Sequence, residues 1–361
     1  MLELTFYIIV FIQVFFYLFL FSRFAFSKIE KKPTNRYPIS VIICAKNEAE
    51  NLEQFLPSII NQNYFDFEIV LVNDNSTDET LKIMQLFEKK SNNIKVVNLS
   101  ENNSNKKNAV TQGVKASRYE HLLFTDADCK PVSANWISEM SSHFNAQKQL
   151  ILGYGAYRKI NNSWLNKLIR FETVLTAIQY FSYAKINLAY MGVGRNLAYT
   201  KSLFKKNNGF ESHQHIKSGD DDLFINQVAN KKNVSCCYSG SSFTVSEPHI
   251  SLNKWIYQKR RHISTASVYK PIHQLLLGFF YISQFLFWIL GFYLLFFTQF
   301  SSNILILFSF RIVLQYLIYG YSSKKLKEGD LILYIPFLEL FLILIQMRIF
   351  MQNLISKPTN W

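Results

Sequence analysis

Two carboxylates, Asp126 and Asp128, directly follow an apolar run that is typical of a buried strand. Carboxylate oxygens are hard ligands of the kind that Mg²⁺ or Mn²⁺ takes while it holds a substrate phosphate. Because side chains alternate along an extended chain, both carboxylates would point to one side and could face one metal ion. The alternative is a polar turn, and an Asp-x-Asp pattern alone does not decide between the two.

Further acidic side chains stand at two other points of the sequence. Asp74 follows a second strand-like run, where it could accept a hydrogen bond from a base or ribose, or simply belong to a helix cap. Asp220, Asp221 and Asp222 are consecutive at the start of an expected helix. One or two acids would cap that helix, but three repel one another and raise the pKa of at least one carboxyl. A raised pKa suits a general base.

Cations come from the segment 258–262, whose sequence is Gln-Lys-Arg-Arg-His. An arginine guanidinium can hold a diphosphate through two parallel hydrogen bonds, whereas a lysine ammonium offers a point charge. The alternative is attraction of this segment to anionic lipid headgroups, and Lys259 and Arg260 could serve that purpose alone.

These side chains must be positioned by a series of alternating strands and helices. The expected strands are 38–45, 67–72, 95–99 and 120–125, and the expected helices follow Asn47-Glu48 and cover 77–89 and 105–116. Strict alternation at this spacing predicts an α/β fold with a Rossmann-like, mainly parallel sheet and right-handed crossovers. Ligands bind at the carboxyl ends of such strands, which is where Asp74, Asp126 and Asp128 would lie.

Four apolar segments are long enough to cross a bilayer as helices. Residues 4–21 and 274–297 contain no charged side chain, and 303–321 and 331–350 are similar but contain charge. Glu3 precedes the first segment and positive residues follow it, so we expect an uncleaved anchor and not a signal peptide. The positive-inside rule then places residues from about 23 to 272 in the cytoplasm.

The formal net charge of +14 would suit a nucleic-acid ligand. Much of this charge lies beside the expected spans, at 23–36, 254–270 and 324–327, where it suits anionic lipid headgroups. We therefore expect membrane lipids, and not nucleic acid, as partners. The 4 cysteines form no Cys-x-x-Cys pair, so neither a zinc site nor a disulfide framework is expected.

Two charged residues, Arg311 and Glu339, lie inside expected spans. At about 1.5 Å per residue, each would sit roughly 14–15 Å from the cytoplasmic end of its helix. An unpaired charge in a bilayer costs several kcal/mol, so we hypothesise an ion pair between the two helices. The rival hypothesis is that Arg311 reaches the phosphate of a lipid-linked molecule.

Five motifs, taken in order, resemble the family 2 glycosyltransferases, which have a GT-A fold and include membrane-embedded polysaccharide synthases. They are Ser-Val-Ile-Ile-Cys-Ala-Lys-Asn-Glu at 40–48, Val-Asn-Asp-Asn-Ser-Thr-Asp at 72–78, Asp-Ala-Asp at 126–128, Asp-Asp-Asp-Leu at 220–223 and Gln-x-x-Arg at 258–261. The resemblance implies inverting transfer from a nucleotide-sugar donor, often a UDP-sugar, with Mg²⁺ or Mn²⁺. We expect a lipid-linked or saccharide acceptor.

The resemblance also implies a role for each matching residue. Four residues would line the nucleobase pocket: Ala45, Lys46, Glu48 and Asp74. Lys106 would lie near the nucleotide, Asp126 near the ribose or donor sugar, and Asp128 on the metal. Asp220 matches the catalytic aspartate that takes the acceptor proton. A further set would serve the acceptor or the diphosphate: Arg195, Asn196, Asp221, Asp222, Gln258 and Arg261.

Two positions depart from the family pattern. Gly219 stands where the family often has Glu, and His262 stands where processive synthases have a Trp that stacks on the growing polymer. The missing Trp and the small number of spans favour a non-processive or short-chain transferase. The alternatives are a processive exopolysaccharide synthase and a catalytically inactive membrane scaffold that binds a nucleotide sugar.

The expected organisation has four parts. Residues 1–24 form a membrane anchor, 25–250 a cytoplasmic GT-A domain, 251–272 an interfacial amphipathic helix and 273–361 further transmembrane helices. Within the GT-A domain we expect a longer amphipathic helix over 163–184, a strand near 190–199 and a helix over 220–230. The implied location is the cytoplasmic membrane of a bacterium, with the catalytic domain on the cytoplasmic side.

Overall fold

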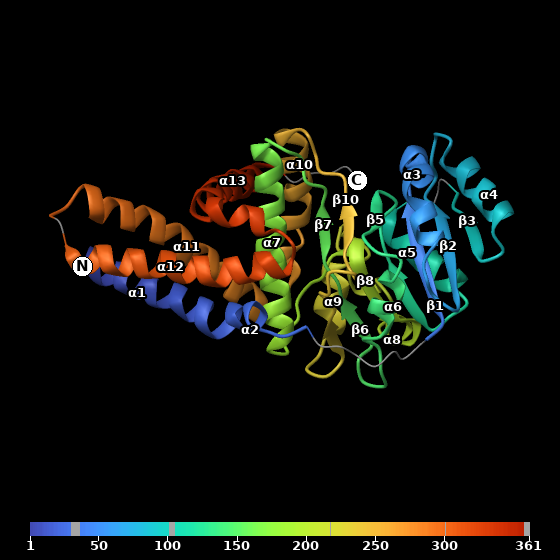
Figure 1. The fold of residues 1–361 in the computed structure, drawn as a ribbon, viewed down its shortest axis with the longest axis horizontal. Helices are drawn as coiled ribbons and strands as arrows, with labels where there is room; N and C mark the ends of the chain where they lie inside the picture. Colours follow the sequence, from blue (N-terminus) through green and yellow to red (C-terminus); the bar gives the residue numbers. More distant parts are fainter. Residues whose placement is uncertain (30–36, 101–104, 217, 300, 357–361) are drawn as a thin grey trace. The chain divides into compact units, whose positions relative to one another are not determined.

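The computed structural model describes residues 1–29, 37–100, 105–216, 218–299 and 301–356 (Figure 1). The chain groups into two compact units, each built from separate stretches of sequence. The sheet unit contains Ile29–Arg158 and Asn187–Pro248, and the helical unit contains Met1–Lys28, Lys159–Ile186 and His249–Asn360. The part of the predicted basic stretch that holds Lys31, Lys32 and Arg36 lies outside the described residues.

The first half of the sheet unit has the alternating strands and helices that the sequence predicts. Its strands are β1 (Ile39–Ala45), β2 (Phe67–Asn73), β3 (Ile94–Asn98) and β4 (His121–Phe124). The helices between them are α3 (Ala49–Ile60), α4 (Thr80–Lys90) and α5 (Lys106–Ala116). β1 pairs in parallel with β2 and β4, and β2 pairs in parallel with β3, so the predicted parallel arrangement is confirmed for these strands.

β8 (Leu197–Thr200) reverses the direction of the sheet. It pairs antiparallel with β4 on one side and with β6 (Leu150–Leu152) on the other, and β6 pairs in parallel with β9 (Val234–Cys236). In the described residues the sheet has seven strands, in the order β3-β2-β1-β4-β8-β6-β9. The sheet is therefore mainly parallel, as predicted, and the reversal at β8 is a feature that the sequence analysis did not foresee.

Shorter elements complete the sheet unit. A second sheet joins β5 (Cys129–Pro131), β10 (Thr244–Ser246) and β7 (Gly155–Tyr157), and the remaining helices are α6 (Trp136–Ser141), α8 (Lys201–Lys206) and α9 (Asp222–Val228).

The centre of the large sheet explains where a ligand can bind. From β1 the chain passes outward to β2 and β3, and then returns to β4 on the opposite side of β1. The carboxyl ends of β1 and β4 thus form a topological switch point, the usual ligand site of such sheets. α5 lies tightly against β1, because a Cβ added at Gly113 would stand 2.7 Å from Ile42 Cγ2. α5 is therefore packed directly against the strand whose carboxyl end contributes to this switch point.

The described part of the helical unit contains four helical segments that are long and apolar enough to cross a membrane, as the sequence predicts. The first segment, Leu2–Ala25, consists of α1 (Leu2–Phe15), a π-helical turn (Phe16–Phe21) and α2 (Ser22–Ala25). The others contain α11 (Pro271–Phe296), α12 (Ser302–Lys325) and α13 (Ile335–Ile355), and a 3₁₀ turn over Gly329–Tyr334 precedes α13. Their length and composition fit a membrane protein.

Two further helices, α7 (Trp164–Lys185) and α10 (Leu252–Ile263), belong to the same unit. We expected α7 to be part of the 25–250 domain, whereas the structure groups it with the membrane helices. Arg170 of α7 is 2% exposed and donates from Nε to Glu328 at 2.8 Å and from Nη2 to Asp330 at 2.6 Å. A buried guanidinium needs such partners, and the loop before α13 supplies them.

A buried polar cluster joins all four spans. Arg311 of α12 and Glu339 of α13 are 0% exposed and share two hydrogen bonds of 2.9 Å each. Gln13 of α1 accepts from Arg311 at 2.9 Å, and Gln284 and Trp288 of α11 donate to Glu339 at 2.5 and 2.8 Å. The hypothesised ion pair is confirmed. Both terminal nitrogens of Arg311 are engaged, so the structure does not favour the rival hypothesis of a lipid phosphate.

Candidate active site

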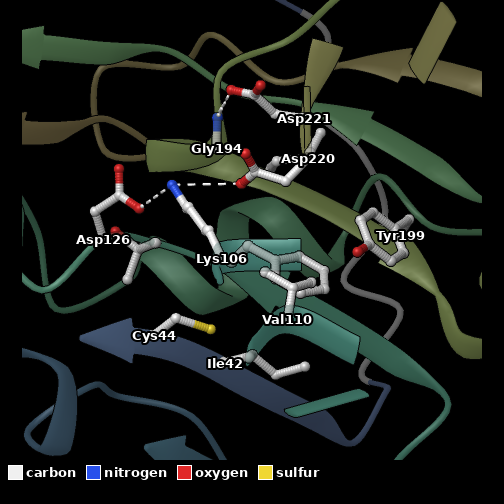
Figure 2. Close-up of a pocket in the computed structure, with 12 residues that line it drawn as sticks. Ile42, Cys44, Lys106, Val110, Asp126, Gly194, Tyr199, Asp220 and Asp221 are labelled. Carbon is white, nitrogen blue, oxygen red and sulfur yellow. Dashed lines mark hydrogen bonds and ion pairs between the residues drawn. The ribbon is translucent and has the colours of Figure 1, made fainter. Parts of the chain in front are cut away.

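Lys106 lies between two carboxylates from distant parts of the sequence, as Figure 2 shows. Its Nζ is 3.1 Å from Asp126 Oδ1 and 3.3 Å from Asp220 Oδ2. Burial alone would lower the pKa of Lys106, but the negative charges of Asp126 and Asp220 outweigh it and raise the pKa well above its usual value. The ammonium is therefore charged at neutral pH. All three side chains line one pocket, and the sequence predicted each of them as a site residue.

The elements that carry these residues are fixed at their ends. Lys106 is the first residue of α5, which Asn105 caps by accepting the N–H of Asn108 at 2.9 Å. Asp126 follows β4, where the Thr125 hydroxyl donates to the carbonyl of Arg195 at 3.0 Å. The carboxyl end of β4 is thereby tied to the turn that enters β8.

Gly219 accounts for one of the two departures from the family pattern. Its φ of +96° lies in the region that favours glycine, and an added Cβ would lie 2.5 Å from Leu223 Cδ1. A side chain at this position would disturb the turn that leads into Asp220. The glycine is thus required by the local backbone.

The three consecutive acids have different partners. Asp221 Oδ2 accepts the N–H of Gly194 at 2.8 Å (Figure 2), and its Oδ1 accepts the N–H of Asp222 at 2.8 Å. Burial, followed by the charges of Asp220 and Asp222, raises the pKa of Asp221 to about 7. Asp222 is 7% exposed and accepts the N–H of Leu223 at 2.8 Å. Of the three, Asp220 is the one that pairs with Lys106.

Asp126, Asp128 and Cys129 bring one possible ligand atom each to within 4.8 Å of one another. Burial and the charge of Asp126 raise the pKa of Asp128, a situation that a divalent cation would relieve. The two carboxylates fit Mg²⁺ or Mn²⁺. The thiol of Cys129 does not, because burial raises its pKa and its Sγ lies 3.0 Å from Ser246 Oγ. The carboxylate pair is therefore the better donor set.

The residues predicted for the nucleobase pocket lie where β1 and β2 end. Ala45 is the last residue of β1, and its carbonyl accepts the N–H of Asp74 at 2.9 Å. Both residues are buried, whereas Lys46 is exposed. Glu48 accepts from the Asn51 amide at 2.5 Å. The structure brings Ala45 and Asp74 together, and contact of these four residues with a base remains a prediction.

Asn196 requires a correction, because it was predicted on the acceptor side. It is 0% exposed, accepts from Trp136 Nε1 at 3.0 Å and donates to the Tyr154 carbonyl at 2.9 Å. No part of its side chain reaches the surface, so it supports the loop and does not contact an acceptor in this structure. Its neighbour Arg195 donates to two main-chain carbonyls of β7 at 2.9 and 3.0 Å, which engages its guanidinium as well.

Other pocket-lining residues were missed by the sequence analysis. They form the apolar part of the wall: Ile42, Cys44, Val110, Phe124, Leu197 and Tyr199. Apolar strand residues carry no chemical signal, since every central strand contains them. Gly194 was part of the quoted Gly-x-Gly pattern, and its N–H proves to be the partner of Asp221.

The predicted Gln258 and Arg261 lie on α10 and belong to the helical unit. Lys259 Nζ is 2.5 Å from Glu172 Oε2, and Arg260 Nε donates to Asn353 at 2.9 Å. In the described part of the chain, the guanidinium of Arg261 has no hydrogen-bond or ion-pair partner. Lys259 and Arg260 therefore support protein packing, which disfavours the lipid-headgroup role, and a diphosphate contact of Arg261 remains a prediction.

The mainly parallel sheet with a charged pocket at its switch point is the arrangement expected of a GT-A fold. Residues 40–207 match the family described as Glycosyl transferase family 2. A mannosyltransferase, PcManGT from Pyrobaculum calidifontis in complex with GDP-Man and Mn²⁺, has a similar fold with a TM-score of 0.58. That likeness covers 94% of this chain and 99% of the other at 15% identity.

Curated relatives match over shorter stretches. A poly-β-1,6-N-acetyl-D-glucosamine synthase of Staphylococcus epidermidis is 35% identical over 111 residues, which is 28% of this chain and 26% of the relative. A poly(ribitol-phosphate) β-glucosyltransferase of Bacillus spizizenii is 26% identical over 203 residues, or 55% of this chain and 30% of the relative. The chain thus spans only about a quarter of the length of the first relatives, so they show the kind of domain and not the whole activity.

Proposed function

We propose that the protein transfers a sugar, with inversion, from a nucleotide-sugar donor to a lipid-linked or saccharide acceptor at the cytoplasmic face of a bacterial membrane. The observation that carries this proposal is the bridge from Lys106 to Asp126 and Asp220 at the switch point of the sheet. A UDP-sugar is the favoured donor. The names of the matched relatives, which are transferases or synthases of sugar polymers, support the same class of reaction.

In the proposed reaction, Asp220 takes the proton of the acceptor hydroxyl while the hydroxyl oxygen of the acceptor attacks the anomeric carbon. The bond from that carbon to the donor diphosphate breaks, and Lys106 and Arg261 offset the charge of the leaving group. Asp128 would hold Mg²⁺ or Mn²⁺, which when bound would neutralise the diphosphate, and Asp126 would contact the ribose or the donor sugar. Ala45, Lys46, Glu48 and Asp74 would hold the nucleobase end of the donor.

The test is a panel of labelled UDP- and GDP-sugars offered to the purified full chain in lipid nanodiscs with Mn²⁺. We expect one donor to be turned over, and Asp128→Ala or Asp220→Asn to lower turnover by about 10²–10³-fold. Asp220→Asn should leave donor binding nearly unchanged. Glu247→Gln, which removes an exposed carboxylate paired with Arg158 in the same unit, is the matched control and should remain active. Donor binding without turnover in the wild type would instead support an inactive scaffold.

A processive synthase is the second candidate, favoured by the similarity to the poly-β-1,6-N-acetyl-D-glucosamine synthase of Staphylococcus epidermidis. We prefer a non-processive transferase, because His262 stands where the family pattern has a stacking Trp. The length of the product separates the two candidates. A single added sugar or a short oligomer supports our proposal, and a long polymer would support the alternative.

A further inference from the structure

Two adjacent lysines at the start of α5 reach the same stretch of chain. Lys106 pairs with Asp220, and Lys107 Nζ donates to the backbone carbonyls of His213 at 2.6 Å and Ile216 at 2.8 Å. We propose that Lys107 is a positioning residue that fixes the backbone leading to Asp220 and thereby holds the base in place. This inference rests on the proposed function, in which Asp220 takes the acceptor proton.

Lys107 is buried to a degree that is unusual for a lysine, since 2% of it is exposed. An ammonium group has three N–H donors, and two of them meet main-chain carbonyls. Among the described residues, no carboxylate lies within ion-pair distance of its Nζ. Its contribution is therefore to bind backbone, in contrast to Lys106, which binds carboxylates.

The helix that carries Lys107, α5, is held firmly in place. α5 is capped by Asn105, and its inner face is buried at Ala109, Val110 and Val114. The close contact of Gly113 with Ile42 leaves no gap between the helix and β1. When the two bonds of Lys107 are lost, the other side of the contact is the one that moves.

Within the described part of the chain, the segment on the other side of the contact has only short-range backbone hydrogen bonds, such as that from the N–H of Ile216 to the His213 carbonyl at 3.1 Å. His213 ends a short 3₁₀ turn, Glu211–His213, and its ring packs edge-on against Phe210 with centroids 5.8 Å apart. From this turn to α9, the described residues form neither strand nor regular helix. A segment without ladder hydrogen bonds depends on the few partners it has. Lys107 supplies two of them, just before the sharp turn at Gly219.

Loss of Lys107 should therefore act on the chemical step. The Ile216 carbonyl would lose this partner and the His213 carbonyl would keep only the N–H of Ile216. The segment would then shift, and Asp220 would shift with it. A displacement of about 1 Å at a reacting group costs roughly 10²-fold in rate. The expected donor contacts at the ends of β1 and β2 are untouched, so donor binding should persist. A purely structural lysine would lower stability without separating kcat from KM.

The experiment compares Lys107→Met with Lys201→Met in the full chain in nanodiscs. Lys201 is the matched control, because its Nζ also donates to a backbone carbonyl, that of Ser117 at 2.6 Å, and it does not line the pocket. We expect Lys107→Met to lower kcat by about 10- to 100-fold while the donor KM stays within about twofold. Lys107→Arg, which keeps cationic donors, should recover part of the rate, and Lys201→Met should stay within about twofold of the wild type.

A readout that is independent of activity is amide hydrogen exchange over 211–223. We expect faster exchange there in Lys107→Met than in Lys201→Met. If Lys107→Met does not fold, Lys107→Gln, which keeps a shorter donor, is measured in its place and should show the same direction of change. Equal kcat and equal exchange in the two lysine variants would overturn the inference. An inactive wild type would instead count against the proposed function, and the exchange data would still decide the role of Lys107.

Discussion

The guanidinium of Arg311 and the carboxylate of Glu339 meet through two hydrogen bonds of 2.9 Å in the interior of the membrane helices. Neither side chain has any exposed surface. A buried pair of this kind adds little net stability compared with apolar residues, but removal of one partner leaves the other charge stranded. The pair therefore determines which faces of α12 and α13 pack together, because any other packing would leave a buried charge without its partner.

Single substitutions at this pair should be far more harmful than the double exchange. We expect Arg311→Glu or Glu339→Arg alone to cost about 3–5 kcal/mol, and the charge-swapped double variant to recover much of the loss. Thermal unfolding in detergent measures the effect. The exposed pair Glu79 and Lys82 is the control, because its exchange should change stability by no more than about 1 kcal/mol. A double variant as unstable as either single variant would contradict the pairing.

Arg260 and Arg261 are neighbours on α10 with separable roles. Arg260→Ala removes the bonds to Asn353 and to the Gln352 carbonyl, so it should lower the unfolding temperature of the protein. Arg261→Ala removes a cation without a described partner, so it should leave that temperature nearly unchanged and weaken turnover instead. Paired measurements of unfolding temperature and donor turnover test this. The same loss of stability in both variants would show that Arg261 is structural.

Stability should depend on pH through Asp221. Burial, and then the charges of Asp220 and Asp222, raise its pKa to about 7, whereas the pKa of an aspartate in the unfolded chain is about 3.9. Between roughly pH 4 and pH 7 the folded protein holds a proton that the unfolded chain releases, so the free energy of unfolding falls as the pH rises. We expect the unfolding temperature in EDTA to fall across this range. Asp221→Asn should show a smaller fall, and an unchanged slope would argue against this assignment.

Gly219 should not tolerate a side chain. With a φ of +96° and 2.5 Å between an added Cβ and Leu223, Gly219→Ala should cost at least about 1 kcal/mol and reduce turnover by displacing Asp220. Gly278→Ala is the control, because nothing lies within 4 Å of a Cβ added there. Enzyme assays and thermal unfolding of both variants decide the matter. Equal behaviour of the two variants would show that the turn is more permissive than its geometry indicates.

The sequence predicted the first half of the sheet unit well, because strands buried on both faces leave continuous apolar runs. Helix starts were less predictable. α4 begins at Thr80 and not at Thr77, since the N–H of Thr77 donates to Asn47 at 2.8 Å, and that partner lies 30 positions away. Contacts of this range leave no local pattern.

Some residues of the candidate site could likewise be predicted from the sequence, and others could not. Lys106, Asp126 and Asp220 could be predicted because charged residues in a family motif stand out. The prediction that Asn196 contacts the acceptor was wrong, because the sequence pattern of a polar residue in a glycine-rich loop is the same whether its side chain faces a ligand or buried carbonyls. The reversal at β8 was missed because strands of 3 or 4 residues, such as β6 and β8, are too short to carry a periodic signal.

Gln13 has a consequence for how the protein is made. It accepts a hydrogen bond from Arg311, which lies 298 positions later in the chain, and it donates to Ser283 at 2.7 Å. At about 5–20 residues per second of synthesis, roughly 15–60 s separate the two partners. During that time the first helix rests in the bilayer with its amide unmatched, while the sheet unit is being synthesised. The hydrogen bonds of Gln13 can therefore form only after the sheet unit has been synthesised.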